Sequence, residues 1–213
     1  MCSPDYATMK SVILPAGVVH IWRVDLGTWS GSGDELDAAE RARAARFRFP
    51  DIQRRWIAGR AVLRQLLERY TGIPAAELCF ARGEFGKPYL AGSNVYFNMS
   101  DSREVALYAV TLDAEIGVDV ERIRDIEGAT IARRFLPESE AAAVDDDPAS
   151  FFRIWTRREA YLKCIGVGLR RLDLPIAPGF SVADLDPAPG YAGAAVWQGA
   201  ERSVVVRDFD TAG

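Results

Sequence analysis

The sequence predicts an α+β fold in two halves. A strand, then helices, then further strands occur twice along the 213 residues, and each pass takes about 100 residues. Apolar residues make up 49% of the chain, which is enough for a core, and charged residues 26%, which is ordinary for a folded domain. We therefore expect two similar units, although no residue-level repeat accompanies the repeated order of elements.

The first half is expected over residues 16–111, after a loose leader at residues 1–15. Its first strand alternates side chains between two faces, and its longer helix has an apolar stripe at helical spacing that ends before Gly72 and Pro74. Asp34 is the expected N-cap of the shorter helix. We expect a strand over residues 17–26, helices over residues 34–49 and 51–70, strands over residues 78–81, 95–98 and 105–111, and a loop over residues 83–88.

The second half is expected over residues 112–213 and repeats this order. Its longest helix is closed by Gly166 and Gly168, because glycine commonly ends helices. We expect a strand over residues 116–123, helices over residues 130–135, 138–144 and 150–165, and strands near residues 180–182, 194–197 and 203–206.

Composition excludes several classes of function. The net charge of −4 argues against a general nucleic-acid binder, and no apolar run approaches the roughly 20 residues that a membrane span needs. Three cysteines without the spacing of a metal cage, and no signal-peptide pattern, indicate reduced thiols in a cytoplasmic protein. The single histidine, His20, is expected to be structural, and it excludes mechanisms that need two histidines.

Basic residues are concentrated in one stretch of this acidic chain. Between Arg41 and Arg64 there are eight arginines, and Asp51 is the only acidic residue. A local basic surface of this kind indicates an anionic ligand or an acidic partner at one place. The alternative is a solvated, arginine-rich helix face that binds nothing.

Asp119 and Glu121 are the first candidates for chemistry. Side chains two residues apart in a strand point to the same face, so these carboxylates are expected side by side. Adjacent carboxylates repel unless a cation lies between them, and Mg²⁺ prefers carboxylate oxygens. The pair therefore indicates a metal site, and the alternative is a solvent-facing strand end paired with Arg122 or Arg124.

The helix expected over residues 150–165 carries a second set of candidates. Glu159 and Lys163 lie one turn apart and away from its main apolar stripe. They indicate either the lining of a cleft or an ordinary surface ion pair, worth only about 0.3–0.5 kcal/mol. Arg158 falls inside the apolar stripe, so it needs a buried partner, either a phosphate or a carboxylate.

Taken together, the two sets suit phosphoryl transfer. Glu159 could complete a magnesium shell with Asp119 and Glu121, and Lys163 could neutralise a phosphate on the same metal.

The spacing of these residues resembles the signature of the 4′-phosphopantetheinyl transferase superfamily. The segment IGVDVE at residues 116–121 is followed, at a separation of about 35–40 residues, by W-x-x-x-E-x-x-x-K from Trp155 to Lys163. The segment FNMSDS at residues 97–102 is similar to the family's F-N-x-S-H-S. The loop Gly86-Lys87-Pro88 and the segment Gly166-x-Gly168-Leu169 also match, so the ordered matches cover most of the chain.

Length and layout resemble the surfactin-synthetase-type group, in which one chain forms a pseudodimer. The resemblance implies two similar α+β subdomains in a pseudo-twofold arrangement, each a small, mainly antiparallel sheet packed on a long helix. It implies a monomer that binds coenzyme A in the cleft between the halves, with the metal site in the second half.

The resemblance also implies the activity. The enzyme would transfer the 4′-phosphopantetheine group of coenzyme A to a serine of an apo acyl or peptidyl carrier protein and release adenosine 3′,5′-bisphosphate. Attack would be in line and assisted by Mg²⁺, with Mn²⁺ as the alternative metal. The carrier could belong to fatty acid, polyketide or nonribosomal peptide biosynthesis.

Site residues follow by position from the resemblance. Asp119, Glu121 and Glu159 would bind the metal, and Glu159 would accept the serine proton. Lys163 would contact the pyrophosphate and stabilise the leaving nucleotide. The nucleotide would be held by Ser100, Gly86 and Lys87, and its 3′-phosphate by Arg55, Arg43 and Arg46.

Two positions depart from the family pattern. Asp101 stands where the family has a histidine that helps to hold the coenzyme phosphates, and an ionised aspartate cannot neutralise them. A nearby arginine compensates for it, or Asp101 reaches the metal, or coenzyme A binds more weakly. Arg158 stands where lysine is usual, which is a milder change.

Two other functions use the same residues. A magnesium-dependent phosphodiesterase or pyrophosphatase would transfer the phosphoryl group to water. A non-enzymatic descendant would bind coenzyme A or carriers without turnover, which Asp101 would explain.

Overall fold

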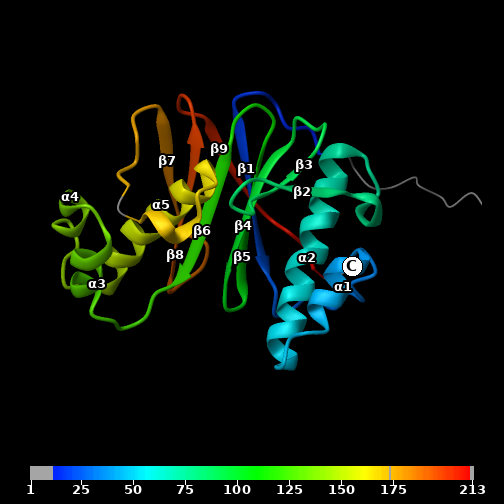
Figure 1. Ribbon diagram of the computed structural model, residues 1–213, viewed down its shortest axis with the longest axis horizontal. Coiled ribbons are helices and arrows are strands. Elements are labelled where there is room, and N and C mark those ends of the chain that lie inside the picture. The colour runs from blue at the N-terminus through cyan, green and yellow to red at the C-terminus, as the bar shows by residue number, and fades with distance from the viewer. Residues whose placement is uncertain (1–11, 173, 212–213) are drawn as a thin grey trace, which may run out of the picture.

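The computed structural model describes residues 12–172 and 174–211, and its two main sheets lie between two long helices (Figure 1). Helix α2 (Pro50–Thr71) covers the outer face of the first sheet, and helix α5 (Pro148–Ile165) covers the outer face of the second. The inner faces of the sheets meet in one apolar cluster. The α+β class is confirmed, because each half is a sheet packed on a long helix. Residues 1–11 of the expected leader lie outside the described residues.

The first sheet has the strand order β4-β5-β1-β9. Strands β1 (Val18–Asp25), β4 (Tyr96–Ser102) and β5 (Val105–Thr111) pair in antiparallel fashion. Strand β9 (Ser203–Asp208) comes from the far end of the chain and pairs in parallel with β1. The expected boundary at residue 111 therefore does not divide the sheets completely, because the last strand of the second half completes the first sheet.

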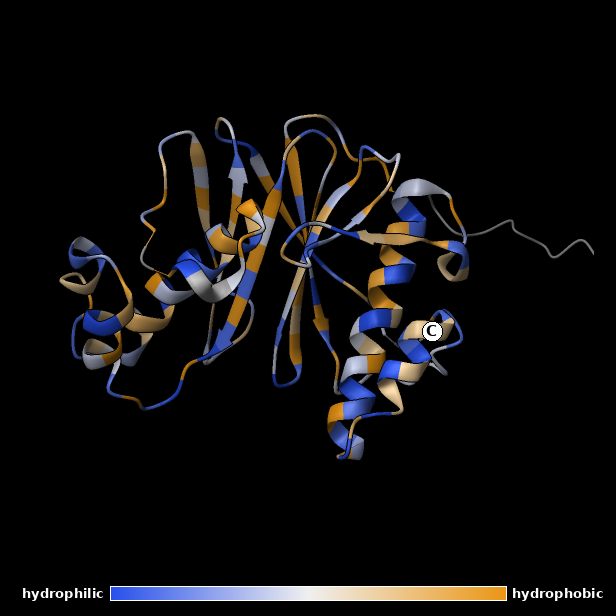
Figure 2. Ribbon diagram, in the orientation of Figure 1, coloured by the Kyte–Doolittle hydropathy of each residue, from blue (hydrophilic) through white to orange (hydrophobic). Residues whose placement is uncertain are grey.

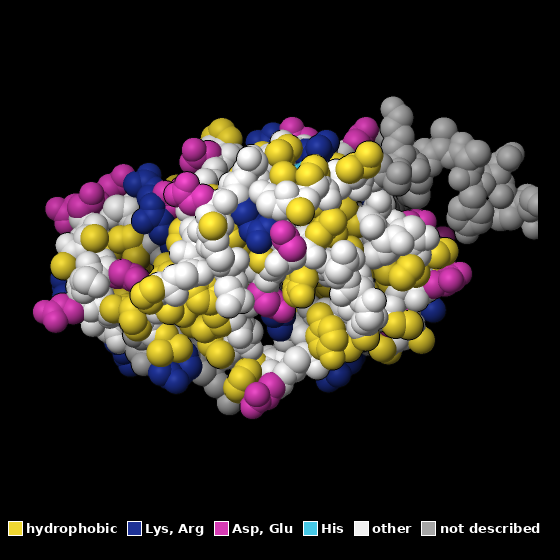
Figure 3. All heavy atoms as spheres, turned by 90° about the horizontal axis from the view of Figure 1, so that it is seen from above, with side chains coloured by type: hydrophobic (Ala, Val, Ile, Leu, Met, Phe, Trp, Pro, Cys, Tyr) yellow, Lys and Arg dark blue, Asp and Glu magenta, His cyan; other side chains and the backbone are white. Residues whose placement is uncertain are grey.

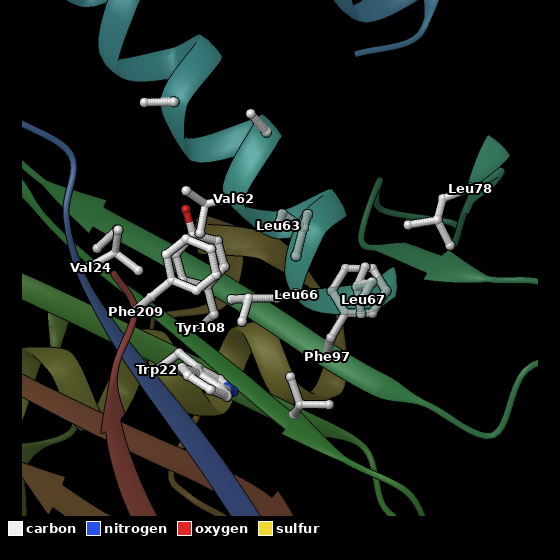
Figure 4. Close-up of a cluster of buried hydrophobic side chains, with 14 of the residues drawn as sticks. Trp22, Val24, Val62, Leu63, Leu66, Leu67, Leu78, Phe97, Tyr108 and Phe209 are labelled. Atoms are coloured by element: carbon white, nitrogen blue, oxygen red, sulfur yellow. The ribbon is translucent and has the colours of Figure 1, made fainter. Parts of the chain in front are cut away.

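The core of the first half lies between α2 and this sheet. Hydrophobic and hydrophilic residues alternate along α2, which therefore has one apolar face (Figure 2). The central strands β1 and β5 bury hydrophobic residues on both faces, one toward α2 and one toward the second sheet. Trp22 and Tyr108 from neighbouring strands face Leu66 of α2 (Figure 4). Burying one such leucine stabilises the fold by about 1.5–3 kcal/mol relative to exposure.

Helix α1 (Ala38–Ala44) begins later than expected. Asp37, and not the expected Asp34, is its N-cap: the Asp37 carboxylate accepts a hydrogen bond from the backbone N–H of Glu40 at 2.8 Å. Glu40 accepts one in return from the backbone N–H of Asp37 at 3.2 Å, which completes a capping box. The pattern D-x-x-E at residues 37–40 is the sequence signal that would have located this start.

The expected loop over residues 83–88 joins two short strands. β2 (Phe80–Arg82) and β3 (Pro88–Leu90) form a separate antiparallel hairpin, which lies after a 3₁₀ turn at Ala75–Glu77. β3 was not expected, because three residues are too few to show a strand periodicity.

The second sheet has the order β6-β8-β7 and is antiparallel throughout. Its strands are β6 (Ile116–Arg122), β7 (Phe180–Leu185) and β8 (Tyr191–Gln198). Helices α3 (Gly128–Phe135) and α4 (Glu138–Ala141) precede α5, and a 3₁₀ turn at Gly168–Arg171 follows it.

Helix α5 packs directly on β6 at Gly117. A Cβ atom there would lie 2.0 Å from the carbonyl oxygen of Ala160 and 2.5 Å from the backbone nitrogen of Cys164. Only glycine allows this approach. The contact places one side of α5 against the strand that carries Asp119 and Glu121.

Other expectations can be compared with the described residues. None of the described helices is long and apolar enough to cross a membrane. Cys79 is exposed and Cys164 is buried, both as free thiols, while Cys2 lies outside the described residues. His20 is buried with its Nδ1 atom 2.8 Å from the hydroxyl of Tyr70, which is a structural position.

Candidate active site

The two sheets meet along the edge strands β4 and β6. Side chains of β4, and not its backbone, form the hydrogen bonds to the β6 backbone there. Asn98, Ser100 and Ser102 alternate along β4 and therefore share one face. The Asn98 side-chain oxygen accepts a hydrogen bond from the backbone N–H of Val118 at 3.0 Å, and the Ser102 hydroxyl accepts one from that of Arg122 at 3.1 Å. The polar residues of the FNMSDS segment thus join the two halves, a role that their alternation in the sequence could have suggested.

The same face of β4 supplies hydroxyl groups to the expected carboxylates. Ser100 donates to Asp119 Oδ1 at 2.7 Å, and Ser102 donates to Glu121 Oε2 at 3.0 Å. Asp119 is only 1% exposed. The two carboxylates that share a face of β6 therefore lie at the junction between the sheets.

Lys163 of α5 contacts Asp119 directly. Its ammonium donates to Asp119 Oδ1 at 2.6 Å and to the Ser100 hydroxyl at 2.8 Å. The Glu159 carboxylate lies 3.9 Å from the same ammonium. Asp119, Glu159 and Lys163 therefore lie together, and the pair Glu159–Lys163 along α5 is part of a sheltered cluster rather than an isolated surface pair.

Glu159 has the most perturbed acidity of this cluster. Burial raises the pKa of Glu159 to about 7, and the negative charge of Asp119 adds to the rise. Lys163 and a hydrogen bond from the Trp155 side chain act in the opposite direction. Burial also raises the pKa of Asp119, whereas Lys163 lowers it. Desolvation and neighbouring negative charge both disfavour the ionised form, which a bound cation would relieve.

The fit of these residues to a divalent cation can be tested on one atom. Asp119 Oδ2 is buried and accepts no hydrogen bond from the protein. A buried carboxylate oxygen without a partner is costly, and hard cations such as Mg²⁺ bind such oxygens. Within residues 12–172 and 174–211, however, no three His, Cys, Asp or Glu side chains are close enough together to form a metal site. The donor chemistry fits the cation, while the carboxylates are not gathered around one point.

A cavity of about 480 Å³ lies between α2 and the face of β4 that carries Met99 and Asp101, opposite to Ser100 and Ser102, and contains part of the arginine-rich stretch. Arg43, Arg55 and Asp101 line it together with Arg60 and Arg82. The Arg43 guanidinium lies over the Trp56 ring, 5.4 Å from its centroid. Lys163 and Arg55 lower the pKa of the Asp101 carboxyl while desolvation, the larger effect, raises it. Asp101 therefore lines the cavity and also interacts electrostatically with Lys163 and Glu121 of the cluster.

Comparisons with known proteins agree with this geometry. A family model described as the 4′-phosphopantetheinyl transferase superfamily matches residues 115–207, and one described as 4′-phosphopantetheinyl transferase, N-terminal, matches residues 20–112. The chain is 36% identical over 198 residues to the 4′-phosphopantetheinyl transferase HetI of Nostoc sp., an alignment that covers 79% of this chain and 83% of the relative. The chain belongs to the 4′-phosphopantetheinyl transferase superfamily.

More distant relatives are similar over shorter stretches. The 4′-phosphopantetheinyl transferase gsp of Aneurinibacillus migulanus is 33% identical over 120 residues, which cover 54% of this chain and 49% of that protein. An L-aminoadipate-semialdehyde dehydrogenase-phosphopantetheinyl transferase of Xenopus laevis is 27% identical over 187 residues, which cover 74% of this chain and 62% of that protein.

The expected phosphate-binding arginines of this transferase are only partly together. Arg43 and Arg55 line the 480 Å³ cavity, whereas Arg46 lies beside Arg43 on a neighbouring concave surface. Several other arginines of the stretch serve the fold. Arg64 is fully buried and bonds to Glu40 and Asp37, and Arg60 pairs with Glu40. The stretch is therefore neither wholly a solvated face nor wholly a binding surface.

The three residues that were expected to hold the nucleotide have hydrogen-bond partners within the protein. The Gly86 carbonyl accepts a hydrogen bond from Arg82 at 3.0 Å, and the Lys87 ammonium bonds to protein acceptors outside the 480 Å³ cavity. The Ser100 hydroxyl is taken up by Asp119 and Lys163. The Gly86 carbonyl and the side chains of Lys87 and Ser100 therefore bond to the protein at positions where nucleotide contacts were expected.

Arg158 has the buried partner that its position requires. The side chain is fully buried and pairs with Glu140 of the segment α4, to which its Nε donates at 3.1 Å. The expected choice between a phosphate and a carboxylate is therefore decided in favour of a carboxylate. Arg158, which stands where lysine is usual, therefore lies outside the carboxylate cluster.

Proposed function

We propose that this chain transfers the 4′-phosphopantetheine group of coenzyme A to a serine of an apo acyl or peptidyl carrier protein and releases adenosine 3′,5′-bisphosphate. The observation that carries the proposal is the meeting of Asp119, Glu159 and Lys163 at the junction of the sheets. An arginine-lined cavity lies across β4 from them, and Asp101 of its lining interacts electrostatically with Lys163. Family membership supports the reaction class.

Asp119, Glu121 and Glu159 are the residues that would hold Mg²⁺ or Mn²⁺. When bound, the metal would neutralise the pyrophosphate of coenzyme A and stabilise the charge that develops on it. The buried, unpartnered oxygen of Asp119 and the raised pKa values of Asp119 and Glu159 support this assignment.

Proton transfer falls to Glu159. Without metal the pKa of Glu159 is about 7, and a bound cation would lower it, so the carboxylate would be ionised and able to accept the serine proton. The Lys163 ammonium lies 3.9 Å from the Glu159 carboxylate. Its positive charge would stabilise the negative charge that grows on the departing nucleotide. Asp119 and Ser100 hold the Lys163 ammonium in place through hydrogen bonds of 2.6 and 2.8 Å.

The nucleotide would lie in the 480 Å³ cavity, with Arg43 and Arg55 as donors to its 3′-phosphate. Arginine suits this role because its planar fork donates two hydrogen bonds to one phosphate. Arg46 could join them only by a side-chain movement from the neighbouring surface. A contact with Gly86 and Lys87 would use their backbone, since their side-chain positions offer no free donor to the cavity.

The partners follow from the reaction. The carrier protein would bring an acidic surface to a basic and apolar groove, and exposed arginines of residues 41–64 outside the cavity, such as Arg48 and Arg54, would meet it. The net charge of −4 supports a protein that is not a general nucleic-acid binder. We further propose a cytoplasmic monomer that does not bind membranes, which the resemblance to single-chain pseudodimers and the pattern of cysteines support.

Mass spectrometry tests the proposal. An apo carrier protein incubated with the chain, coenzyme A and Mg²⁺ should gain the mass of one phosphopantetheine group. Several acyl and peptidyl carriers should be tried, and no gain on any of them would refute the proposal. Release of adenosine 3′,5′-bisphosphate without a carrier would instead indicate a phosphodiesterase, and coenzyme binding without turnover a non-enzymatic binder.

Asp101 is expected to weaken coenzyme A binding. Its carboxylate lines the same cavity as Arg43 and Arg55, so its negative charge opposes the coenzyme phosphates. Replacing Asp101 by Asn should lower the KM for coenzyme A about 3–10-fold, equivalent to about 1 kcal/mol. Steady-state kinetics at saturating carrier would measure it.

The same experiment separates the explanations for Asp101. If Asp101 helps to hold the metal, the Asp101→Asn variant should lose kcat while its KM for coenzyme A stays constant. Asp125→Asn is a matched control, because it makes the same chemical change at an exposed position outside the cavity. An unchanged or higher KM in Asp101→Asn would contradict the expectation.

A further inference from the structure

The Lys87 ammonium lies among three protein acceptors. It donates to Glu115 Oε2 at 2.6 Å, to the Cys164 carbonyl at 2.8 Å and to the Ile116 carbonyl at 3.0 Å. A lysine ammonium has three hydrogens, so all of them are engaged. The side chain is 16% exposed. Lys87 therefore has no hydrogen left with which to bind a nucleotide phosphate.

These acceptors belong to segments that are far apart in the sequence. Lys87 directly precedes β3 of the hairpin, Ile116 is the first residue of β6, and Cys164 lies in the last turn of α5. The carbonyl groups of a last helical turn have no partner inside the helix and form the negative end of its dipole. A lysine ammonium both donates hydrogen bonds to these carbonyl groups and places a positive charge at the negative end of the dipole. One side chain thus fastens the hairpin, the start of β6 and the end of α5 to one another.

The aliphatic stem of Lys87 also packs at this end of the helix. Its Cδ atom would lie 3.6 Å from a Cβ placed on Gly166, the C-cap of α5. Lys87 lines a cavity of about 660 Å³ together with the aromatic residues Phe85, Tyr89 and Tyr96. On this face, charged side chains lie among hydrophobic ones (Figure 3). Because only 16% of the Lys87 side chain is exposed, its two hydrogen bonds to backbone carbonyls are largely shielded from water.

The fastened ends are those that carry the reactive residues. Cys164 directly follows Lys163, and Ile116 lies three residues before Asp119 on β6. We propose that Lys87 is a positioning residue: it holds the last turn of α5 against β6 and so places the Lys163 ammonium on Asp119. The inference rests on the proposed transferase function. It assigns Lys87 an effect on the rate of transfer rather than on the binding of coenzyme A.

The relative strength of the three bonds sharpens the proposal. Glu115 is 49% exposed, so its ion pair with Lys87 is screened by water and contributes little. The two backbone carbonyls are held in place by β6 and α5, so they cannot rotate away as a side chain can. Removing the charge of Glu115 should therefore change the rate much less than removing the ammonium of Lys87.

The test compares Lys87→Met with a matched control. Arg23→Met removes another cation that joins a carboxylate, Asp208, to a distant backbone carbonyl, that of Pro187, and Arg23 contacts neither α5 nor β6 through these bonds. Lys87→Met should lower kcat roughly 10–100-fold, because small displacements of reacting groups have effects of that size. The KM for coenzyme A should stay within about twofold of wild type. Lys87→Arg should recover part of the rate, and Glu115→Gln and Arg23→Met should leave kcat nearly unchanged.

Hydrogen exchange gives a second measurement that does not depend on turnover. In Lys87→Met, the amides of residues 116–119 and 160–166 should exchange faster than in wild type, and in Arg23→Met they should not. A higher KM for coenzyme A with unchanged kcat and unchanged exchange would overturn the proposal in favour of a nucleotide contact. Unchanged kinetics and exchange would overturn it as well. If wild type itself transfers no phosphopantetheine, the proposed function fails, and the exchange measurement still decides the role of Lys87.

Discussion

Replacing Glu159 by Gln is expected to reduce phosphopantetheinyl transfer by about 10³-fold or more. Glutamine keeps the shape of the side chain but can neither accept the serine proton nor contribute a negative oxygen to a cation. The loss should appear in kcat, since Glu159 does not line the arginine-rich cavity. Transfer to an apo carrier, followed by mass spectrometry over time, would measure it.

The same substitution should stabilise the fold at high pH. The pKa of Glu159 is about 7 in the folded protein and close to 4.5 when unfolded, so the folded state binds the extra proton between these values. The stability of wild type should therefore fall as the pH rises from about 4.5 to 7, and Glu159→Gln should remove that loss. Above pH 7 without metal, we expect the variant to be about 1–3 kcal/mol more stable. Urea unfolding at pH 5 and pH 8 would measure the difference.

An exposed glutamate provides the control for both measurements. Glu138 lies exposed on α4, so Glu138→Gln should leave activity and the pH dependence of stability unchanged. If Glu159→Gln retained activity within tenfold of wild type, Glu159 could not be the proton acceptor. If it lost activity and also lost stability at pH 8, misfolding would explain the loss and the assignment would not stand.

The residues of the proposed active site could be located from the sequence because each obeys a local rule. Asp119 and Glu121 share a face of a strand, and Glu159 and Lys163 share a side of a helix, whatever the rest of the fold does. Their meeting depends on α5 lying against β6, which the order of motifs implied through the family resemblance. The hydrogen bond from Ser100 to Asp119 was not predictable in the same way, because it depends on how β4 packs beside β6.

Lys87 and β9 show where sequence reasoning ends. The motif around Lys87 is a loop, and loop sequences carry no periodicity that sets the direction of a side chain. The ammonium therefore turned out to bind Cys164 and Ile116 rather than the cavity. The last strand was expected, but a strand pattern does not state which sheet the strand joins. β9 pairs with β1, almost two hundred residues earlier, because that edge of the first sheet is the one within its reach.

Replacing Gly117 by Ala is expected to destabilise the protein by more than about 3 kcal/mol and to lower its soluble yield. The added methyl group would overlap the carbonyl oxygen of Ala160, 2.0 Å away, and the backbone nitrogen of Cys164, 2.5 Å away. Both obstacles are backbone atoms of α5, so no side-chain rotation relieves the overlap. Overpacking of a well-packed core ordinarily costs about 1–3 kcal/mol, and a backbone obstacle should exceed that range.

Gly59→Ala is the matched substitution that should not destabilise. A Cβ at Gly59 would meet the Met99 methyl group at 3.4 Å, the flexible end of a side chain, and Gly59 lies inside helix α2. Alanine at a helix interior gains about 0.8–1.0 kcal/mol over glycine, so the variant should be as stable as wild type or more. Denaturant unfolding of the two variants measures the contrast. If Gly117→Ala were as stable as Gly59→Ala, α5 could not lie on β6 as closely as it does here. The placement of Lys163 on Asp119 would then lose its structural basis, because both residues belong to the pair of elements that meet at Gly117.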